Sequence, residues 1–248
     1  MVNVKVKVGV CGFARSQDTI FTNLRLLEVQ TTFYKPMKRS TAENWRLHAP
    51  KDFEFTLKAW QLITHEPTSP TYRKARIAIA ENEMDTYGFF RPTDNVLEAW
   101  SVTNEIRNAL DAKIVVFQSP ASFKETEKNI TNMRDFFRAI DKDRKDITMV
   151  WEHRGKWDRK TIAKLCNALE LVHGVDPFAE APVTSDFAYF RLHGSPPGKR
   201  MCRYTYTDDD LKRLYEKCLN TGSPEVYVLF NNDTMYDDAL RFMKMVSG

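Results

Sequence analysis

The sequence lacks the usual signals of export, of a membrane anchor and of a disulfide or zinc framework. Its four cysteines, Cys11, Cys166, Cys202 and Cys218, form no C-x-x-C pair and no zinc-finger spacing, so we expect free thiols in a reducing compartment. No apolar run approaches the roughly 20 residues of a membrane helix. The start, MVNVKVKVGV, alternates valine with polar residues as a strand does, unlike a secretory signal. These absences predict a cytoplasmic protein that does not enter a membrane.

Two nucleotide-binding motifs are missing as well. The first predicted strand is not followed by G-x-G-x-x-G and no P-loop occurs, which disfavours a doubly wound nucleotide-binding fold. The net charge of +4, from 37 basic and 33 acidic residues, permits an anionic partner without requiring one. With 42% hydrophobic residues in a chain of 248, the composition is that of a globular protein with a substantial core.

What the sequence does contain is an alternation of strand-like and helix-like segments. Strands are predicted at residues 4–12, 26–34, 53–59, 113–118, 147–153, 171–176, 187–194 and 225–232. Helical segments are predicted at 18–25, 40–48, 70–86, 95–110, 125–141, 158–169, 208–219 and 234–246. Eight strand–helix repeats in about 250 residues predict an α/β protein, a single (β/α)8 TIM-like barrel domain over residues 1–248. The longer helical connection lies at about 60–112.

Alternation within the strands indicates which side chains face the barrel interior. In the stretch TSDFAYFRLHG, residues 184–194, Arg191 and His193 fall on one face while apolar residues fill the other. Outward side chains of a barrel strand pack on helices and are apolar, so the polar face points inward. The same sorting in the other strands adds an inward set of Glu28, Tyr34, Lys58, Gln118, Glu152, Arg154, Asp176 and Asn231.

Charges inside a partly dehydrated barrel mouth need partners. Each unpaired charge there would cost several kcal/mol, so these groups pair with one another, face solvent or await a ligand. Mutual pairing would make them a purely structural polar plug. We favour a ligand site, because barrel enzymes keep their chemistry at the C-terminal ends of the strands.

Several motifs together resemble the YecE-like family, also known as domain of unknown function 72. They are GVCGF (9–13), EVQTTFY (28–34), FTLKAWQLITH (55–65), VVFQSPASF (115–123), TSDFAYFRLHG (184–194) and YVLFNND (227–233). The resemblance runs from Gly9 to about Leu240 and implies a single TIM-like barrel, but it supplies no reaction. It carries over Glu28, Tyr34, Lys58, Glu152 and Arg154, and it adds His65 as a candidate site residue.

The leading hypothesis is an enzyme, of hydrolase or lyase type, that acts on a small anionic or phosphorylated molecule. Glu28 or Glu152 would be the general base, with His193 or Lys58 as proton donor or electrostatic stabiliser. Arginine forks bind phosphate or carboxylate in a bidentate manner. The predicted substrate-binding residues are Tyr34, His65, Gln118, Arg154, Asp176, Arg191, Asn231 and Asn232.

Two other functions remain open. The stretch GKRMCRYTY, residues 198–206, interleaves Lys199, Arg200 and Arg203 with Tyr204 and Tyr206, a pattern that also suits a nucleic-acid-binding or phosphodiester-processing barrel. A non-catalytic binding protein would keep the polar mouth but need no group with a tuned pKa. The sequence leaves the oligomeric state undetermined.

Metal binding is the less favoured alternative. His65, His153 and His193 lie near strand ends with carboxylates nearby, but the sequence contains no H-x-H or H-E-x-x-H spacing. We therefore predict no metal and no other cofactor.

Overall fold

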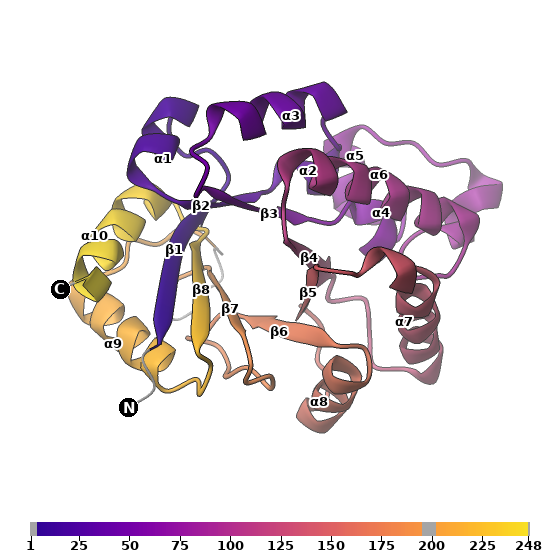
Figure 1. Cartoon of the computed structure of the whole chain (residues 1–248). Coiled ribbons are helices and arrows are strands. Elements are labelled where there is room, and N and C mark those ends of the chain that lie inside the picture. Colours follow the sequence, from indigo (N-terminus) through magenta and orange to yellow (C-terminus); the bar gives the residue numbers. More distant parts are fainter. Residues whose placement is uncertain (1–3, 195–201, 248) are drawn as a thin grey trace. The chain divides into compact units, whose positions relative to one another are not determined.

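The structure is a computed structural model, and it describes residues 4–194 and 202–247. Its parallel strands follow one another in chain order and close into a barrel, which confirms the predicted (β/α)8 TIM-like fold (Figure 1). The strands are β1 (Lys5–Cys11), β2 (Leu26–Val29), β3 (Glu54–Lys58), β4 (Ile114–Ser119), β5 (Thr148–His153), β6 (Leu171–Val175), β7 (Ala188–Leu192) and β8 (Glu225–Phe230).

Helices connect the strands throughout. They are α1 (Gln17–Asn23), α2 (Thr31–Tyr34), α3 (Arg39–His48), α4 (Gln61–Thr64), α5 (Pro70–Ala75), α6 (Asp94–Leu110), α7 (Glu127–Ala139), α8 (Arg159–Ala168), α9 (Asp208–Leu219) and α10 (Met235–Ser247). Two 3-10 turns are η1 (Glu81–Thr86) and η2 (Asp141–Asp143). None of these helices is long and apolar enough to cross a membrane in residues 4–194 and 202–247. All four cysteines are free, as predicted.

The second strand is shorter than predicted. It ends at Val29, and residues 31–34 form α2 instead of continuing the strand. Thr32 explains the change, because its hydroxyl donates to the carbonyl of Val29 at 3.0 Å and to that of Lys58 at 2.7 Å, which turns the chain. The strand-based inward assignment of Tyr34 is therefore wrong, since Tyr34 ends a short helix.

The chain forms two compact units. The first comprises Met1–Glu28, Ala49–Glu54 and Val172–Gly248, and the second comprises Val29–His48 and Phe55–Leu171. The expectation of one domain over residues 1–248 stays a prediction.

In the first unit, β6, β7, β8, β1 and β2 pair in parallel. Gly9 lies where β1 meets β2, and a Cβ at this position would come within 2.4 Å of the Leu26 carbonyl oxygen, so only glycine fits. Helix α10 packs on β1, β8 and α9 (Figure 1). The buried ring of Phe242 on α10 contacts that of Phe230 on β8, which anchors the last helix to the sheet.

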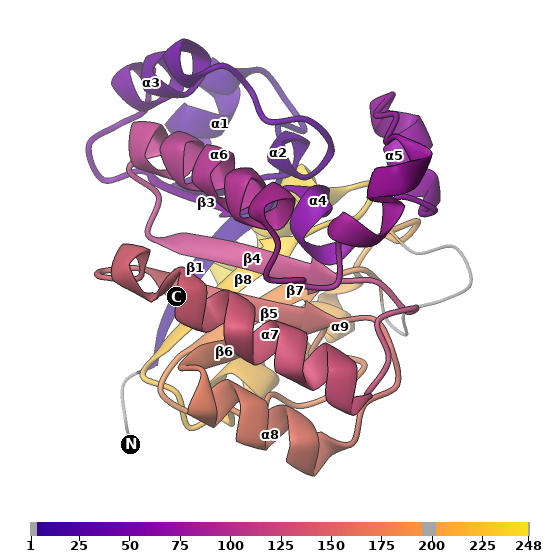
Figure 2. The ribbon, with the colours of Figure 1, turned by 90° about the vertical axis from the view of Figure 1, so that its right-hand side faces the viewer.

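In the second unit, β3, β4 and β5 pair in parallel, and α6 packs against α3 and α4 (Figure 2). Buried aromatic rings fill the space between β4 and α7. The ring of Phe117 on β4 lies 5.9 Å from Phe136 and 5.3 Å from Phe137, both on α7. Phe90 packs on all three of these rings and on Phe123. This cluster is the main apolar core of the second unit.

Candidate functional site

The predicted site residues divide between the two compact units. The first unit holds Glu28, Asp176, Arg191, His193, Asn231 and Asn232. The second holds Tyr34, Lys58, His65, Gln118, Glu152 and Arg154. Most of them lie at or just beyond the C-terminal end of a strand, where barrel enzymes place their functional groups.

Arg191 and Glu28 form a buried ion pair in the first unit. Strands β7 and β2 are separated by β8 and β1, which is roughly 14 Å along the sheet at about 4.8 Å per strand. Arg191 nevertheless donates from Nε to Glu28 Oε2 at 2.9 Å and from Nη2 to Oε1 at 2.7 Å. Both side chains therefore reach across the interior of the curved sheet, which confirms that the polar face of β7 points inward.

This pair has the properties of a polar plug. Both side chains are 0% exposed, and the hydroxyl of Tyr189 donates a further hydrogen bond to Glu28 Oε2 at 2.9 Å. A carboxylate that accepts three such bonds is a poor general base, and a guanidinium fork filled by a carboxylate is not open to a substrate anion. The contacts of Glu28 and Arg191 thus fit the structural alternative better than the predicted catalytic and anion-binding roles.

The other candidates of the first unit also hold the protein together. Asp176 Oδ2 accepts a hydrogen bond from the backbone N–H of His193 at 2.8 Å and lies 3.5 Å from His193 Nδ1. The amide nitrogen of Asn232 donates to Asp238 Oδ2 at 2.7 Å and to the Tyr204 carbonyl at 2.8 Å. The backbone N–H of Asn231 donates to the Leu192 carbonyl at 3.0 Å, which joins the ends of β7 and β8.

The tyrosines of the basic stretch 198–206 are engaged with the protein. Tyr206 is 0% exposed, and its hydroxyl accepts a hydrogen bond from the Gly194 N–H at 2.8 Å. The hydroxyl of Tyr204 donates to Asp210 Oδ2 at 2.7 Å, and burial together with this bond raises the pKa of Tyr204 to about 12. Lys199 and Arg200 lie outside the described residues. Stacking of a nucleic-acid base on Tyr206 is therefore ruled out by its burial.

Lys58 lies at the end of β3 in the second unit. Only 5% of the residue is exposed. Its Nζ donates to Gln118 Oε1 at 3.0 Å and lies 4.1 Å from the centroid of the Phe33 ring. Gln118 is in register with Glu152 on the adjacent strand, and Glu152 Oε1 lies 2.5 Å from Arg154 Nη2. Polar groups therefore form a row across β3, β4 and β5 at their C-terminal ends.

His65 follows α4, close to this row. The residue is 4% exposed, its ring meets Phe33 edge-on at 4.9 Å, and its Nδ1 is 2.8 Å from the hydroxyl oxygen of Thr64. Burial and the positive charge of Lys58 lower the pKa of His65 to about 3. The imidazole is therefore neutral at neutral pH. Across the described residues no group hydrogen-bonds to its Nε2, which leaves that nitrogen for a ligand.

A strained turn holds the backbone around His65. Gly88, Phe89 and Phe90 have φ values of 74°, 53° and 53°, the left-handed region that bulky side chains avoid. The N–H of Gly88 donates to the Leu62 carbonyl, and that of Phe90 donates to the Ile63 carbonyl, each at 2.8 Å. These bonds cap α4 immediately before His65.

The carbonyl of His65 itself is enclosed by this turn and by α5. A Cβ on Gly88 would lie 2.3 Å from the His65 carbonyl oxygen, which shows how closely the turn approaches. The Tyr72 hydroxyl donates to the same oxygen at 2.9 Å. Left-handed non-glycine residues cost about 1–3 kcal/mol each and persist where the surroundings over-determine them. Here Phe90 is locked into the aromatic core, so the strain serves to fix His65.

Sequence reasoning missed most of this support. Phe33 lay inside a recognised motif but had no assigned role, and Tyr72 and Gly88 were not singled out. The only signal was the glycine of YGFFRPTDN, because a glycine before two aromatic residues in a long connection suggests an unusual backbone conformation.

Solved structures of similar fold support the architecture. A DUF72 family protein from Enterococcus faecalis is 21% identical, with a TM-score of 0.74 and 100% coverage of both chains. A DUF72 family protein from Thermotoga maritima is 21% identical, with a TM-score of 0.69 and coverage of 98% of this chain and 100% of that one. A xylose isomerase domain protein from Planctomyces limnophilus is 10% identical, with a TM-score of 0.60 and coverage of 98% and 96%. No protein with a curated description gives a significant match.

Closed topology and polar strand ends together define a TIM-like barrel protein related in fold to xylose isomerase-like barrels. The family model for proteins of unknown function DUF72 matches residues 20–247, so the chain belongs to this family. The resemblance inferred from the motifs is thereby confirmed.

Proposed function

We propose that the chain is an enzyme that acts on a small anionic substrate at the C-terminal ends of β3, β4 and β5. The observation that carries this proposal is the neutral imidazole of His65 beside the buried ammonium of Lys58. A protein that only binds an anion needs the cation. A neutral imidazole whose Nε2 receives no hydrogen bond in the described part of the chain adds a group that can exchange a proton.

The chemistry follows from the two groups. An ammonium in a water-poor site stabilises negative charge that develops on a substrate during bond cleavage. The Gln118 amide and the Phe33 ring orient that ammonium. His65 Nε2 exchanges a proton with the substrate, as acceptor when Nδ1–H donates to Thr64 and as donor when Thr64 donates to Nδ1. Glu152, held by Arg154, is the neighbouring carboxylate that takes the second proton-transfer role.

Proton transfer beside a cation suits hydrolysis or elimination, in line with a hydrolase or lyase. Burial indicates which of these groups belong to the reacting centre. His65 and Lys58 are almost fully enclosed, whereas the Arg154 side chain is 22% exposed and lies toward solvent. We therefore assign the reacting centre to His65 and Lys58. That no metal or other cofactor takes part stays a prediction.

The test is a substrate screen with matched variants. Pools of phosphorylated sugars and of di- and tricarboxylic acids are incubated with wild type, His65→Asn and Lys58→Met, and consumption is followed by 31P and 1H NMR. Asparagine keeps a polar atom near the position of Nδ1 but carries no titratable ring. We expect wild type to consume one component, His65→Asn to bind it without turnover, and Lys58→Met to lose both binding and turnover.

A non-catalytic binding protein would behave differently. A ligand that raises the melting temperature of wild type and His65→Asn equally, with no consumption of any component, would contradict the enzyme proposal and favour the binding protein. The tautomer of His65 is read from its 15N chemical shifts, which separate the acceptor role from the donor role.

A further inference from the structure

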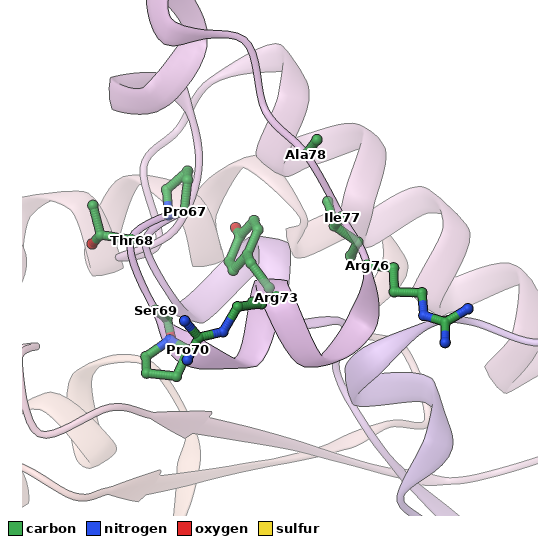
Figure 3. A pocket seen from close by; sticks show the side chains of 9 residues that line it. Pro67, Thr68, Ser69, Pro70, Arg73, Arg76, Ile77 and Ala78 are labelled. Atoms are coloured by element: carbon green, nitrogen blue, oxygen red, sulfur yellow. The ribbon is translucent and has the colours of Figure 1, made fainter.

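A cavity of about 510 Å³ lies on the segment that follows His65 in the second unit. It is lined by α5 and its flanking loops, between Pro67 and Ala78 (Figure 3). Its volume falls in the range of small-molecule binding sites. Pro67 and Ile77 supply apolar walls (Figure 3), and the nearly buried Tyr72 also belongs to the lining.

This cavity carries positive charge only. The segment from Pro67 to Ala80 contains Arg73, Lys74 and Arg76 and no acidic residue. Lys74 is bound to Tyr34, with Nζ 3.2 Å from its hydroxyl and 4.5 Å from its ring centroid. In Figure 3 the side chain of Arg73 extends along the cavity toward Ser69 and Pro70, whereas the Arg76 guanidinium points away.

Arg73 also differs from the arginines that the sequence predicted as anion binders. Arg191 is fully occupied by Glu28, and Arg154 pairs with Glu152. Within residues 4–194 and 202–247, no acceptor receives a hydrogen bond from the guanidinium of Arg73 or Arg76. A guanidinium beside a cavity, with its donors uncommitted, is suited to bidentate recognition of a phosphate.

The cavity is coupled to His65 through its own wall. Tyr72 is 2% exposed, and its hydroxyl donates to the His65 carbonyl oxygen at 2.9 Å. The residue that lines the cavity therefore fixes the backbone of the proposed proton-transfer residue. A ligand in the cavity would therefore lie next to a residue that holds the His65 backbone.

From these contacts we propose that the cavity on α5 binds a small phosphomonoester, with the phosphate on Arg73 and the organic part against Pro67 and Ile77. This assignment rests on the proposed function and names its substrate class. The apolar walls exclude a bare inorganic anion as the best ligand, because they would stay unfilled. Arg76, at the edge, adds long-range attraction without direct contact.

Calorimetric titration with phenyl phosphate at fixed ionic strength tests the assignment, with inorganic phosphate and phenol as the partial ligands. We expect wild type to bind phenyl phosphate more tightly than either partial ligand. Arg73→Met should weaken binding about tenfold to a hundredfold, since a charge-assisted fork contributes about 1.5–3 kcal/mol. Arg73→Lys keeps the charge but loses the fork, so its affinity should lie between those of wild type and Arg73→Met. Arg76→Met should change the affinity about twofold.

Arg134→Met is the matched control, because Arg134 is an exposed arginine on α7, outside the cavity, whose side chain has no hydrogen bond or ion pair within the described residues. It should leave binding unchanged, and all variants should keep the wild-type melting temperature because the substituted side chains are exposed. Equal weakening by Arg73→Met and Arg134→Met would reduce the effect to general electrostatics and overturn the assignment. So would a wild type that binds no phenyl phosphate.

Lys58→Met separates this inference from the proposed function. Loss of binding in Lys58→Met with full binding in Arg73→Met would place the phosphate at Lys58, which overturns the α5 cavity as the site and leaves the enzyme proposal standing. Loss of phenyl phosphate binding in Arg73→Met, together with a shift of the His65 ring resonances when wild type is titrated, supports both the cavity assignment and the proposed function.

Discussion

Two polar clusters near strand ends surround buried charges with different kinds of neighbours. In the first unit, the carboxylate of Glu28 receives the guanidinium fork of Arg191 and the hydroxyl of Tyr189. In the second unit, the ammonium of Lys58 is held by the Gln118 amide and the Phe33 ring, with the neutral imidazole of His65 nearby. Glu28, Arg191 and Lys58 are buried, and each lies at an inward position near the end of a strand.

The difference shows that an inward polar position does not by itself indicate chemistry. A charge that meets its opposite in a bidentate contact has satisfied its hydrogen-bonding capacity and stabilises the barrel in that arrangement. The Lys58 ammonium lies over an aromatic ring beside a histidine with a shifted pKa, and perturbed groups of this kind gather at functional sites. The neighbouring histidine with its shifted pKa, more than the inward position, distinguishes the proposed site from the plug.

Removal of Arg191 should have the largest effect on stability. Arg191→Met leaves Glu28 as a buried carboxylate without its fork, which should lower the free energy of unfolding by about 3–5 kcal/mol. Urea denaturation measures the loss. The double variant Glu28→Leu/Arg191→Met should recover much of it, since no buried charge of the pair remains. If the free energy of unfolding of Arg191→Met falls by less than about 1 kcal/mol, the pair has no structural role.

Gly88→Ala should have the second largest effect on stability, because it disturbs the strained turn of residues 88–90 that holds the His65 backbone, here called the brace of His65. The alanine would have to adopt φ near 74° with its Cβ 2.3 Å from the His65 carbonyl oxygen. We expect a loss of about 2–3 kcal/mol from backbone strain and this steric clash together. Gly222→Ala is the matched control, since Gly222 has φ of 77° but open space around a Cβ, so it should lose only about 1 kcal/mol. Equal losses in the two variants would show that the turn does not press on His65.

The brace of His65 also marks the limit of what the sequence could predict. Apolar runs and alternation located every strand of the barrel, because burial between helices and interior imposes a regular pattern on each strand. Alternation also placed Arg191 on the inner face. It placed Glu28 there as well and allowed the two to pair, but it could not show that they meet, because the contact joins strands three positions apart in the barrel. Whether two side chains meet across the barrel interior depends on how the sheet closes, and no local sequence pattern encodes that closure.

Local rules failed in two further places. The apolar run of residues 26–34 continued past Val29 as a strand pattern, yet the Thr32 hydroxyl bonds to two carbonyls and turns the chain into α2. Phe89 and Phe90 adopt left-handed conformations that their own propensities oppose. The packing of Phe90 in the aromatic core of the second unit offsets the strain of that conformation. The turn is therefore determined by tertiary contacts, which local sequence rules do not see.

The pH dependence of stability tests the neutral state of His65. The unfolded pKa of histidine is about 6.5, and the folded pKa is lowered to about 3. Between these values the unfolded chain binds the proton and the folded chain does not, so the stability that is present above pH 6.5 is lost progressively as the pH falls toward 3. For His65 alone the loss from pH 7 to pH 5 is about 2 kcal/mol.

Urea denaturation of wild type and His65→Asn at several pH values isolates this contribution. The four other histidines are common to both proteins, so the difference between the two curves reports His65. We expect the wild-type curve to fall more steeply below pH 6.5. Parallel curves would mean that the folded protein binds the proton at His65 as readily as the unfolded chain, and the proposed proton-transfer role would lose its basis.

The smallest effect is expected at Lys74, the exposed counterpart of Lys58. The two ammonium groups face neighbouring aromatic rings, Lys58 over Phe33 at 4.1 Å and Lys74 over Tyr34 at 4.5 Å, but Lys74 is exposed to solvent. An exposed cation–π contact contributes about 0.5–1 kcal/mol, so Lys74→Met should cost no more than that in urea denaturation. A loss above about 2 kcal/mol would show that α5 depends on this contact for its docking to α2. The cavity on α5 would then be only as stable as that single contact, and its ligand affinity should fall together with stability in Lys74→Met.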